Sequence, residues 1–292
     1  MKPLQGVRVL SLALNLPGPA ALVRLRQMGA RCAKIEPSPP PGTAPGRATD
    51  PMQAYAAQAY DEMHTGIRML RADLKSTPGQ RLLQRELART DVVLTSFRPS
   101  ALKRLGLGWT TLHRQHPGLS LVSIVGWSGA QAEIPGHDLT YMAEQDLLSG
   151  QDLPPTLFAD MAGALLASEA VLRALLLRHR NGRGTHHEVA LADAATWLAA
   201  PRRWGLTRPQ GAVGGAHAGY RIYACKDGRV AVAALEPHFA QGLCAAAGIE
   251  ARDMFASATH EALATWFSRQ SRRAIDAMAT RLDLPLHTLA RA

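Results

Sequence analysis

Short apolar runs alternate with longer amphipathic segments along the first half of the chain. The short runs are rich in Val, Leu and Ile, which is typical of buried strands, and the longer segments repeat their apolar residues every three or four positions, which is typical of helices. Strands that alternate with helices predict a parallel sheet covered by helices. The predicted strands are Val7–Leu10, Cys32–Ile35, Val92–Thr95 and Leu121–Val125, and the predicted helices are Pro19–Met28, Pro78–Arg89 and Leu112–Gln115.

The middle of the chain contains one long apolar segment. Met161 to His179 predicts a long, mostly buried helix, which ends at the NGRG sequence of Asn181–Gly184 because Asn and Gly favour helix termini. A further strand is predicted at His187–Leu191. Nearer the N-terminus, Pro37–Arg47 is rich in Pro and Gly and therefore predicts a long loop.

The pattern changes after residue 200. A loop-rich stretch, Pro209–Gly219, precedes two short strands, Arg221–Cys225 and Arg229–Ala233, whose Lys-Asp-Gly connection predicts a hairpin. Residues from Pro237 to Leu282 are helical by composition. We therefore predict two domains, residues 1–205 and residues 206–292.

Charge and cysteine content narrow the range of functions. Lys and Arg number 33 against 23 acidic residues, a net charge of +10 that attracts phosphate groups. The basic residues are scattered, without a basic helix or aromatic stacking platform, so we expect no nucleic-acid partner. The stretch from Met161 to Leu177 is too polar for a membrane span, and the first residues do not resemble a signal peptide. Three distant cysteines favour a reducing compartment, and we expect a cytoplasmic protein.

Two short segments are candidates for chemistry. Glycine-rich phosphate loops, a nucleophile elbow and metal-ligand spacings are all absent from the sequence, so we expect no metal site. PGHDLTY, Pro135 to Tyr141, follows a predicted strand, where α/β proteins bind ligands. LFADMAG, Leu157 to Gly163, contains Asp160 at the start of the long helix. From the residues alone, Asp160 is better explained as a helix cap, and His137 beside Asp138 is equally explained as a loop histidine.

Several segments, taken in order, resemble the family III CoA-transferases, which include the α-methylacyl-CoA racemases. The resemblance runs from Leu4 to at least Phe239. It rests on LQGVRVLSL, MGARCAKIEP, RADLKSTPG, DVVLTSFRPSALKRLGLGW, PGHD and NGRGTHHEVALADAA. It implies a Rossmann-like parallel-sheet domain that binds CoA, a second, smaller α+β domain, and an interlocked homodimer.

The racemase branch of this family is indicated by GHDLTY and by VAALEPHF, which matches the segment carrying a catalytic-site glutamate. The resemblance implies three catalytic residues: His137, Asp160 and Glu236. An imidazole with an ordinary pKa of about 6.5 can take the proton beside a thioester carbonyl, with Glu236 orienting the ring. Asp160 would return a proton on the other face, which requires its pKa to be raised. The substrate would be a coenzyme A thioester, with no tightly bound cofactor.

CoA transfer is the alternative activity that the resemblance allows. Asp160 would then act as a nucleophile, through an acyl anhydride and an aspartyl-CoA thioester. Gly214 and Gly215 are similar to a glycine-containing loop that closes over this site in the transferases. The residues expected to bind CoA or acyl-CoA are Arg68, Lys75, Arg98 and Arg104, with Asp138 and Tyr141 along the pantetheine path.

The chain also departs from the family pattern. Ile67 stands where a lysine is common, Ala159 where racemases often have glycine, and Arg47 is only an approximate counterpart of the family's loop arginine. The sequence stops at Ala292, where family members continue through a segment that returns to the first domain. The expected dimer therefore has a shortened C-terminus, and a non-catalytic, CoA-binding member is a third hypothesis.

Overall fold

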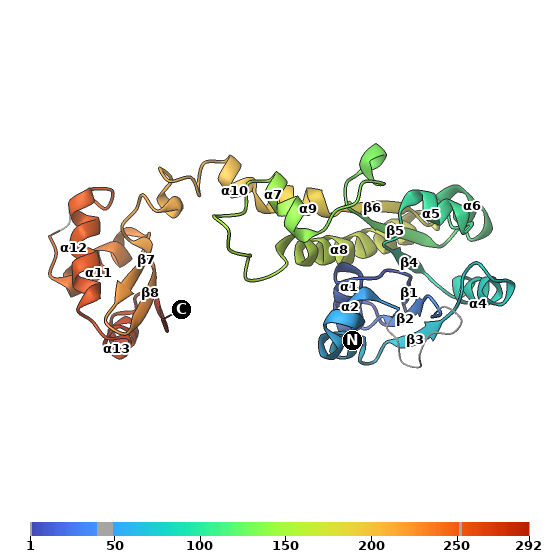
Figure 1. Ribbon diagram of the computed structural model, residues 1–292, viewed down its shortest axis with the longest axis horizontal. Coiled ribbons are helices and arrows are strands. Elements are labelled where there is room, and N and C mark those ends of the chain that lie inside the picture. The colour runs from blue at the N-terminus through green and yellow to red at the C-terminus, as the bar shows by residue number, and fades with distance from the viewer. Residues whose placement is uncertain (1, 40–48, 251–252, 292) are drawn as a thin grey trace. The chain divides into compact units, whose positions relative to one another are not determined.

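The chain forms two compact units, Met1–Ala199 and Ala200–Ala292. The computed structural model describes residues 2–39, 49–250 and 253–291. The predicted loop Pro37–Arg47 falls mostly outside the described residues, and so does Arg47. Each unit has its own hydrophobic core and its own sheet (Figure 1).

A six-stranded parallel sheet organises the first unit. Its strand order is β3-β2-β1-β4-β5-β6, so the chain leaves the middle of the sheet first in one direction and then in the other. The point of reversal lies between β1 and β4, where open α/β sheets bind ligands. The strands are β1 (Arg8–Ser11), β2 (Arg31–Glu36), β3 (Arg68–Arg71), β4 (Val92–Thr95), β5 (Ser120–Val125) and β6 (His186–Ala190).

Helices cover both faces of this sheet. Successive residues of a strand point to opposite faces, so Val92 and Leu94 of β4 pack toward one helix layer and Val93 toward the other. The helices are α1 (Pro17–Gln27), α2 (Pro51–Tyr55), α3 (Ala57–His64), α4 (Thr77–Leu87), α5 (Pro99–Arg104), α6 (Trp109–Gln115), α7 (Asp138–Glu144), α8 (Phe158–Asn181) and α9 (Leu191–Leu198), with a 3-10 turn at Gly129–Gln131. The predicted α/β sheet is confirmed.

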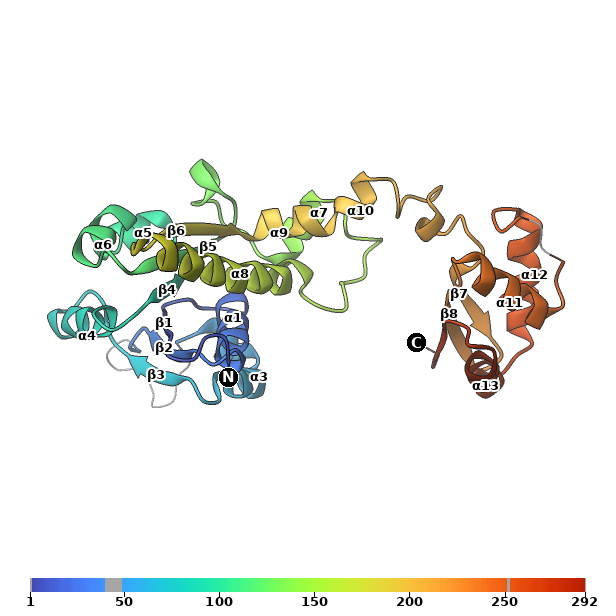
Figure 2. The same cartoon turned by 180° about the vertical axis from the view of Figure 1, so that it is seen from behind.

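The long helix α8 lies alongside β5 and β6 (Figures 1 and 2). Small residues such as Ala164, Ala167 and Ala174 are buried along one side of it, which lets the helix approach the sheet and α1 closely. Gly182 ends α8 with φ +71°, a left-handed conformation that glycine adopts without strain. This helix begins at Phe158, so Asp160 lies in its first turn.

The second unit is a small antiparallel sheet packed against three helices. Tyr223 and Val232 point into a core shared with Leu243, Leu263 and Phe267 of the helices. The predicted hairpin is present, and a third strand that was not predicted pairs with it. The elements are α10 (Ala200–Arg203), a 3-10 turn at Ala212–Gly214, β7 (Tyr220–Cys225), β8 (Gly228–Ala233), α11 (Pro237–Ala247), α12 (Ser257–Ser268), α13 (Arg272–Leu282) and β9 (Leu286–Leu289).

None of the helices within the described residues combines the length and the apolar character that a membrane crossing requires. Cys32, Cys225 and Cys244 are buried free thiols. In the described part of the chain, no three His, Cys, Asp or Glu side chains are grouped as metal ligands would be.

Candidate active site

A cavity of about 230 Å³ lies at the carboxyl ends of the central strands of the first unit. The segments that follow β1, β4, β5 and β6 each contribute to its wall, as does the first turn of α8. Its lining combines apolar side chains, such as Leu14, Phe97 and Ile124, with polar ones. A hollow with convergent polar groups at this place in the fold is a candidate ligand site.

Four of the nine predicted site residues line this cavity: His137, Asp160, Arg98 and Tyr141. They come from the loop before α7, the start of α8, the start of α5 and the body of α7. His137 and Asp160, the two residues predicted to exchange protons, are therefore brought to one cavity. They are far apart in the sequence: Asp138, which follows His137, is 22 positions before Asp160.

Asp160 has an environment that favours its protonated form. Burial raises the pKa of its carboxyl, and the nearby Asp138 carboxylate raises it further, to about 7. Asp138 is itself buried, and its Oδ1 accepts a hydrogen bond of 2.9 Å from the backbone N–H of Asp160. Asp138 thus holds the first turn of α8 in place, and its charge raises the pKa of Asp160 on the cavity wall.

His137 immediately precedes the first residue of α7 and is exposed. Its backbone N–H donates to Thr140 Oγ1 at 3.0 Å, and that hydroxyl donates to the His137 carbonyl at 2.7 Å. These two bonds fix the backbone at the helix start, as a capping residue does. The imidazole is therefore carried on a fixed backbone at the rim of the cavity.

An aromatic pair supports the cavity wall behind His137. Tyr141 is buried, and its ring meets Trp127 edge-on with ring centroids 4.9 Å apart. A side chain at Gly136 would lie only 2.5 Å from Trp127 and 2.7 Å from Tyr141, so the GHD sequence needs glycine here. The glycine in this motif is explained by close packing, and Tyr141 forms part of the cavity wall.

The remaining predicted residues lie outside this cavity. Lys75 and Arg104 are exposed, before α4 and at the end of α5. Arg68 starts β3, at the opposite edge of the sheet, where it pairs with Glu86 in a separate hollow. Glu236 belongs to the second unit, where it is exposed at the start of α11. Their roles remain predictions.

Two polar residues of the cavity wall, Asn15 and Ser96, were not predicted from the sequence. Asn15 and Ser96 follow β1 and β4 and line the cavity, next to a group of buried charged residues that includes Lys34 and Asp50. One signal was available, because Lys34 and Glu36 alternate with apolar residues in a strand that the pattern predicted to be buried. A charged pair on one face of a buried strand indicates a polar network beneath it.

Comparison with known proteins gives matches over the whole chain. The family model of CoA-transferase family III matches residues 4–292. The human protein "Alpha-methylacyl-CoA racemase" is 29% identical over 269 residues, which are 86% of this chain and 66% of the relative. The Agrobacterium fabrum protein "Succinate--glutarate CoA-transferase" is 30% identical over 271 residues, 85% of this chain and 67% of the relative. The chain thus spans about two thirds of the length of these relatives.

A solved structure also matches. The crystal structure of the hypothetical protein Rv3272 from Mycobacterium tuberculosis has a TM-score of 0.83, with 26% sequence identity, and the match covers 100% of this chain and 85% of that one. The fold is therefore shared with a solved structure over its full described extent.

Proposed function

The chain belongs to CoA-transferase family III, and on that premise we propose that it acts on acyl-CoA thioesters as a 2-methylacyl-CoA racemase or epimerase. The observation that carries this proposal is that His137 and Asp160 line one cavity and that the pKa of Asp160 is raised to about 7. An imidazole and a carboxyl that can hold a proton near neutral pH, on the wall of one cavity, are what a two-base proton transfer requires.

The reaction inverts the carbon next to the thioester carbonyl. Neutral His137 removes the proton from one face, and its electron pair moves into the carbonyl to give an enolate. Protonated Asp160 then delivers its proton to the opposite face of the same carbon and is left as a carboxylate. In the reverse direction Asp160 is the base and protonated His137 is the acid, so one proton is held between the two residues in either case.

The developing negative charge on the enolate oxygen needs donors. Backbone N–H groups in the first turn of α8 carry the positive end of the helix dipole, and they lie in the same segment as Asp160. Arg98, an exposed cation on the cavity wall, is suited to a phosphate or carbonyl oxygen of the CoA moiety. We propose Glu236 as a further catalytic residue, and Arg68, Lys75 and Arg104 as contacts to CoA.

CoA transfer is a second candidate, favoured by the relatives that are named CoA-transferases. The Asp160 carboxylate would attack the thioester carbonyl and release CoA thiolate, which gives a mixed anhydride. The thiolate would then attack the Asp160 carbonyl, release the acid as a carboxylate and leave an aspartyl-CoA thioester. This route uses the ionised form of Asp160, which a pKa of about 7 leaves populated at neutral pH.

α-Proton exchange separates the two activities. The protein is incubated with a 2-methylacyl-CoA in D₂O, and deuterium in the thioester is followed by mass spectrometry. We expect exchange with inversion by the wild type, and a loss of about 10²- to 10⁴-fold in the rate of inversion in both His137→Ala and Asp160→Ala, because each removes a positioned acid–base group. Asp61→Asn, on the exposed surface of α3, is the matched control.

The outcomes are distinct. No exchange by the wild type would refute the racemase proposal for this substrate. A CoA adduct on Asp160, trapped and located by peptide mass spectrometry, would then favour transfer. Conversion of one enantiomer into the other that survives Asp160→Ala would contradict the two-base scheme.

We also propose that the protein is a homodimer. Phe158, Met161 and Leu165 lie at helical spacing along the first half of α8, and each is more than a third exposed. An exposed apolar stripe of this kind supports an interface with another chain. Native mass spectrometry measures the state directly.

A further inference from the structure

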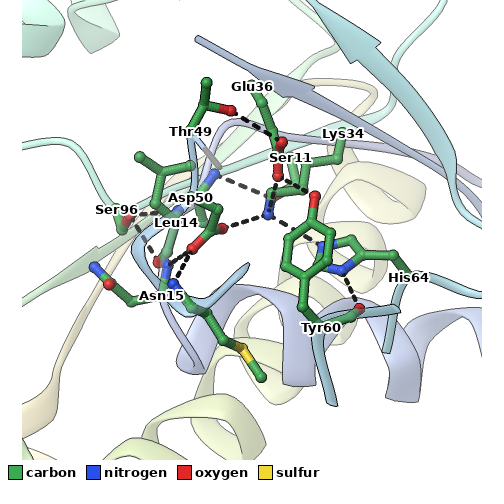
Figure 3. Close-up of polar contacts among 12 residues, drawn as sticks. Ser11, Leu14, Asn15, Lys34, Glu36, Thr49, Asp50, Tyr60, His64 and Ser96 are labelled. Atoms are coloured by element: carbon green, nitrogen blue, oxygen red, sulfur yellow. Dashed lines mark hydrogen bonds and ion pairs between the residues drawn. The ribbon is translucent and has the colours of Figure 1, made fainter. Parts of the chain in front are cut away.

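Buried charged side chains form a group directly beside the cavity, which we call the Lys34 cluster (Figure 3). Its members are at most 7% exposed and come from β2, α3 and the residue before α2. Buried charges are costly unless each is paired and hydrogen-bonded. The cluster consists of Lys34, Glu36, Asp50, Tyr60 and His64.

Lys34 is the centre of the cluster. Its ammonium lies 2.8 Å from Glu36 Oε1, 2.7 Å from Asp50 Oδ2 and 3.1 Å from His64 Nε2. An ammonium has three N–H donors, and these three partners match that number. Because Nε2 of His64 accepts, its Nδ1 carries the proton and donates to the Tyr60 carbonyl at 2.6 Å. Lys34 is therefore held from three sides.

Asp50 extends this network to the wall of the cavity. Its Oδ2 binds Lys34, and its Oδ1 accepts from the backbone N–H of Asn15 at 3.2 Å and from that of Met52 at 2.9 Å. Figure 3 shows Asp50 between the Lys34 ammonium and Asn15. One carboxylate thus joins β2, the turn after β1 and the start of α2.

The turn after β1 needs such support. Asn15 has φ +64°, in the left-handed region that residues other than glycine adopt rarely, so its conformation depends on contacts around it. Its neighbour Leu14 is held from the other side, where the Leu14 N–H donates to Ser96 Oγ at 3.0 Å. Both Leu14 and Asn15 line the cavity that contains His137 and Asp160.

We propose that Asp50, anchored by Lys34, is a positioning residue for the acyl-CoA cavity, which it serves by fixing the Leu14–Asn15 turn. The inference rests on the proposed acyl-CoA function. Asp50 touches no reacting atom in this scheme. It acts through the backbone of Asn15, so its removal displaces one wall of the cavity while His137 and Asp160 remain present.

The test compares two variants of the same cluster. Asp50→Ala removes the carboxylate and with it the contacts to Lys34, Met52 and Asn15, of which the Asn15 bond reaches the cavity. Tyr60→Phe removes the hydroxyl that donates to Glu36 at 2.6 Å, a bond that does not touch Asn15. Hydrogen–deuterium exchange of the Asn15 amide is measured in both, together with kcat and KM for α-proton exchange. The Leu14 amide, bonded to Ser96, is the internal reference.

We expect protection of the Asn15 amide to fall about tenfold in Asp50→Ala, the fold-change that corresponds to one lost hydrogen bond, and to persist in Tyr60→Phe. We expect kcat to fall by about 10- to 100-fold in Asp50→Ala, since displacement by about 1 Å far from the chemistry can cost 100-fold. In Tyr60→Phe, kcat should stay within about twofold of the wild type even where the melting temperature falls.

Equal effects of the two variants on kcat and on Asn15 protection would overturn the inference, because they would show a role in stability alone. Should Asp50→Ala fail to fold, Asp50→Asn replaces it, because the amide keeps an oxygen that can accept from the Asn15 N–H. Its kcat and its Asn15 protection should be lower than those of the wild type and of Tyr60→Phe, but not lost completely. Should the wild type exchange no α-proton, the proposed function fails, and Asn15 protection alone decides the inference: a selective loss in the Asp50 variant supports it, and unchanged protection overturns it.

Discussion

The charge of Asp138 should set part of the pH dependence of the reaction. Asp138→Asn removes that charge but keeps an oxygen that can accept the 2.9 Å hydrogen bond from the Asp160 N–H, so the helix start is preserved. Burial is the larger cause of the raised pKa of Asp160, about 7, and the Asp138 charge is the smaller cause. The substitution should therefore lower the pKa of Asp160 by the smaller part of its rise and leave it above its usual value, because burial remains.

The sign of the effect depends on which enantiomer is the substrate. For the enantiomer that Asp160 deprotonates, activity requires the carboxylate and falls as the pH drops through its pKa, so the acid limb should move to lower pH. For the opposite enantiomer, Asp160 must be protonated, and activity falls as the pH rises through its pKa, so the alkaline limb should move to lower pH. The pH profile of kcat/KM reports these groups in the free enzyme.

The assay measures deuterium incorporation from each pure enantiomer of a 2-methylacyl-CoA between pH 5 and 9, in wild type, Asp138→Asn and the control Asp61→Asn. The reasoning is supported if the acid limb for one enantiomer and the alkaline limb for the other both move to lower pH in Asp138→Asn. Limbs that stay in place, or that move to higher pH, would refute the assignment of the profile to Asp160.

Three further predictions follow from the structure. Arg98→Ala should raise KM for a CoA thioester by about tenfold with little change in kcat, because it removes one exposed, charge-assisted contact, and the difference from wild type should shrink in high salt; Arg85→Ala on α4 is the control. Leu165→Glu should convert the proposed homodimer to a monomer in native mass spectrometry, since it places a charge in the exposed apolar stripe of α8, whereas Glu169→Gln on the same helix should not. In Asp160→Ala, which removes a carboxyl whose raised pKa favours the folded state on acidification, the melting temperature should fall as the pH drops from 8 to 5, because burial lowers the pKa of His64 below its usual 6.5 and the unfolded chain therefore binds more protons. Acidification through the usual Glu range should lower it further, since hydrogen bonds from Lys34 and Tyr60 outweigh burial and lower the pKa of Glu36; a melting temperature of this variant that rises on acidification would contradict both signs.

The sequence predicted the central strands well because they are buried on both faces and read as continuous apolar runs. Val92–Thr95 is correct at both ends, and Cys32–Ile35 lies inside β2. The strands that escaped prediction are at sheet edges. Arg68–Arg71 begins and ends in arginine and is mostly exposed, and Leu286–Leu289 is only half-buried, so neither has the apolar run that marks a strand.

The site was predictable only in part, for a related reason. His137 and Asp160 lie in short segments whose resemblance to a family points to chemistry, and the structure brings both to one cavity. The Lys34 cluster has no such local signature, because Asn15, Lys34, Asp50 and His64 come from four separate segments that meet only in the folded sheet. Long-range convergence of this kind follows from strand order, which periodicity does not determine.

Two pairs of acidic residues near the carboxyl ends of the strands differ in how their charge is compensated. Glu36 and Asp50 share the Lys34 ammonium, and hydrogen bonds from Lys34 and Tyr60 keep the pKa of Glu36 low in spite of burial. Asp138 and Asp160 form no ion pair with any described lysine or arginine, and there burial and mutual repulsion raise the pKa of Asp160 to about 7.

The presence or absence of a neighbouring cation therefore decides whether a pair of acids supports the backbone or takes part in proton transfer. The charges of the pair beside Lys34 are offset by its ammonium, and its hydrogen bonds hold backbone such as the Asn15 turn in place. The lowered pKa of Glu36 makes that carboxyl unsuited to exchange protons near neutral pH. The pair without a cation can hold or release a proton near pH 7, which is the property that acid–base chemistry needs. A cation placed beside Asp160, as in Leu191→Lys on the same cavity wall, should accordingly lower the pKa of Asp160 and abolish its action as an acid while leaving its carboxylate in place.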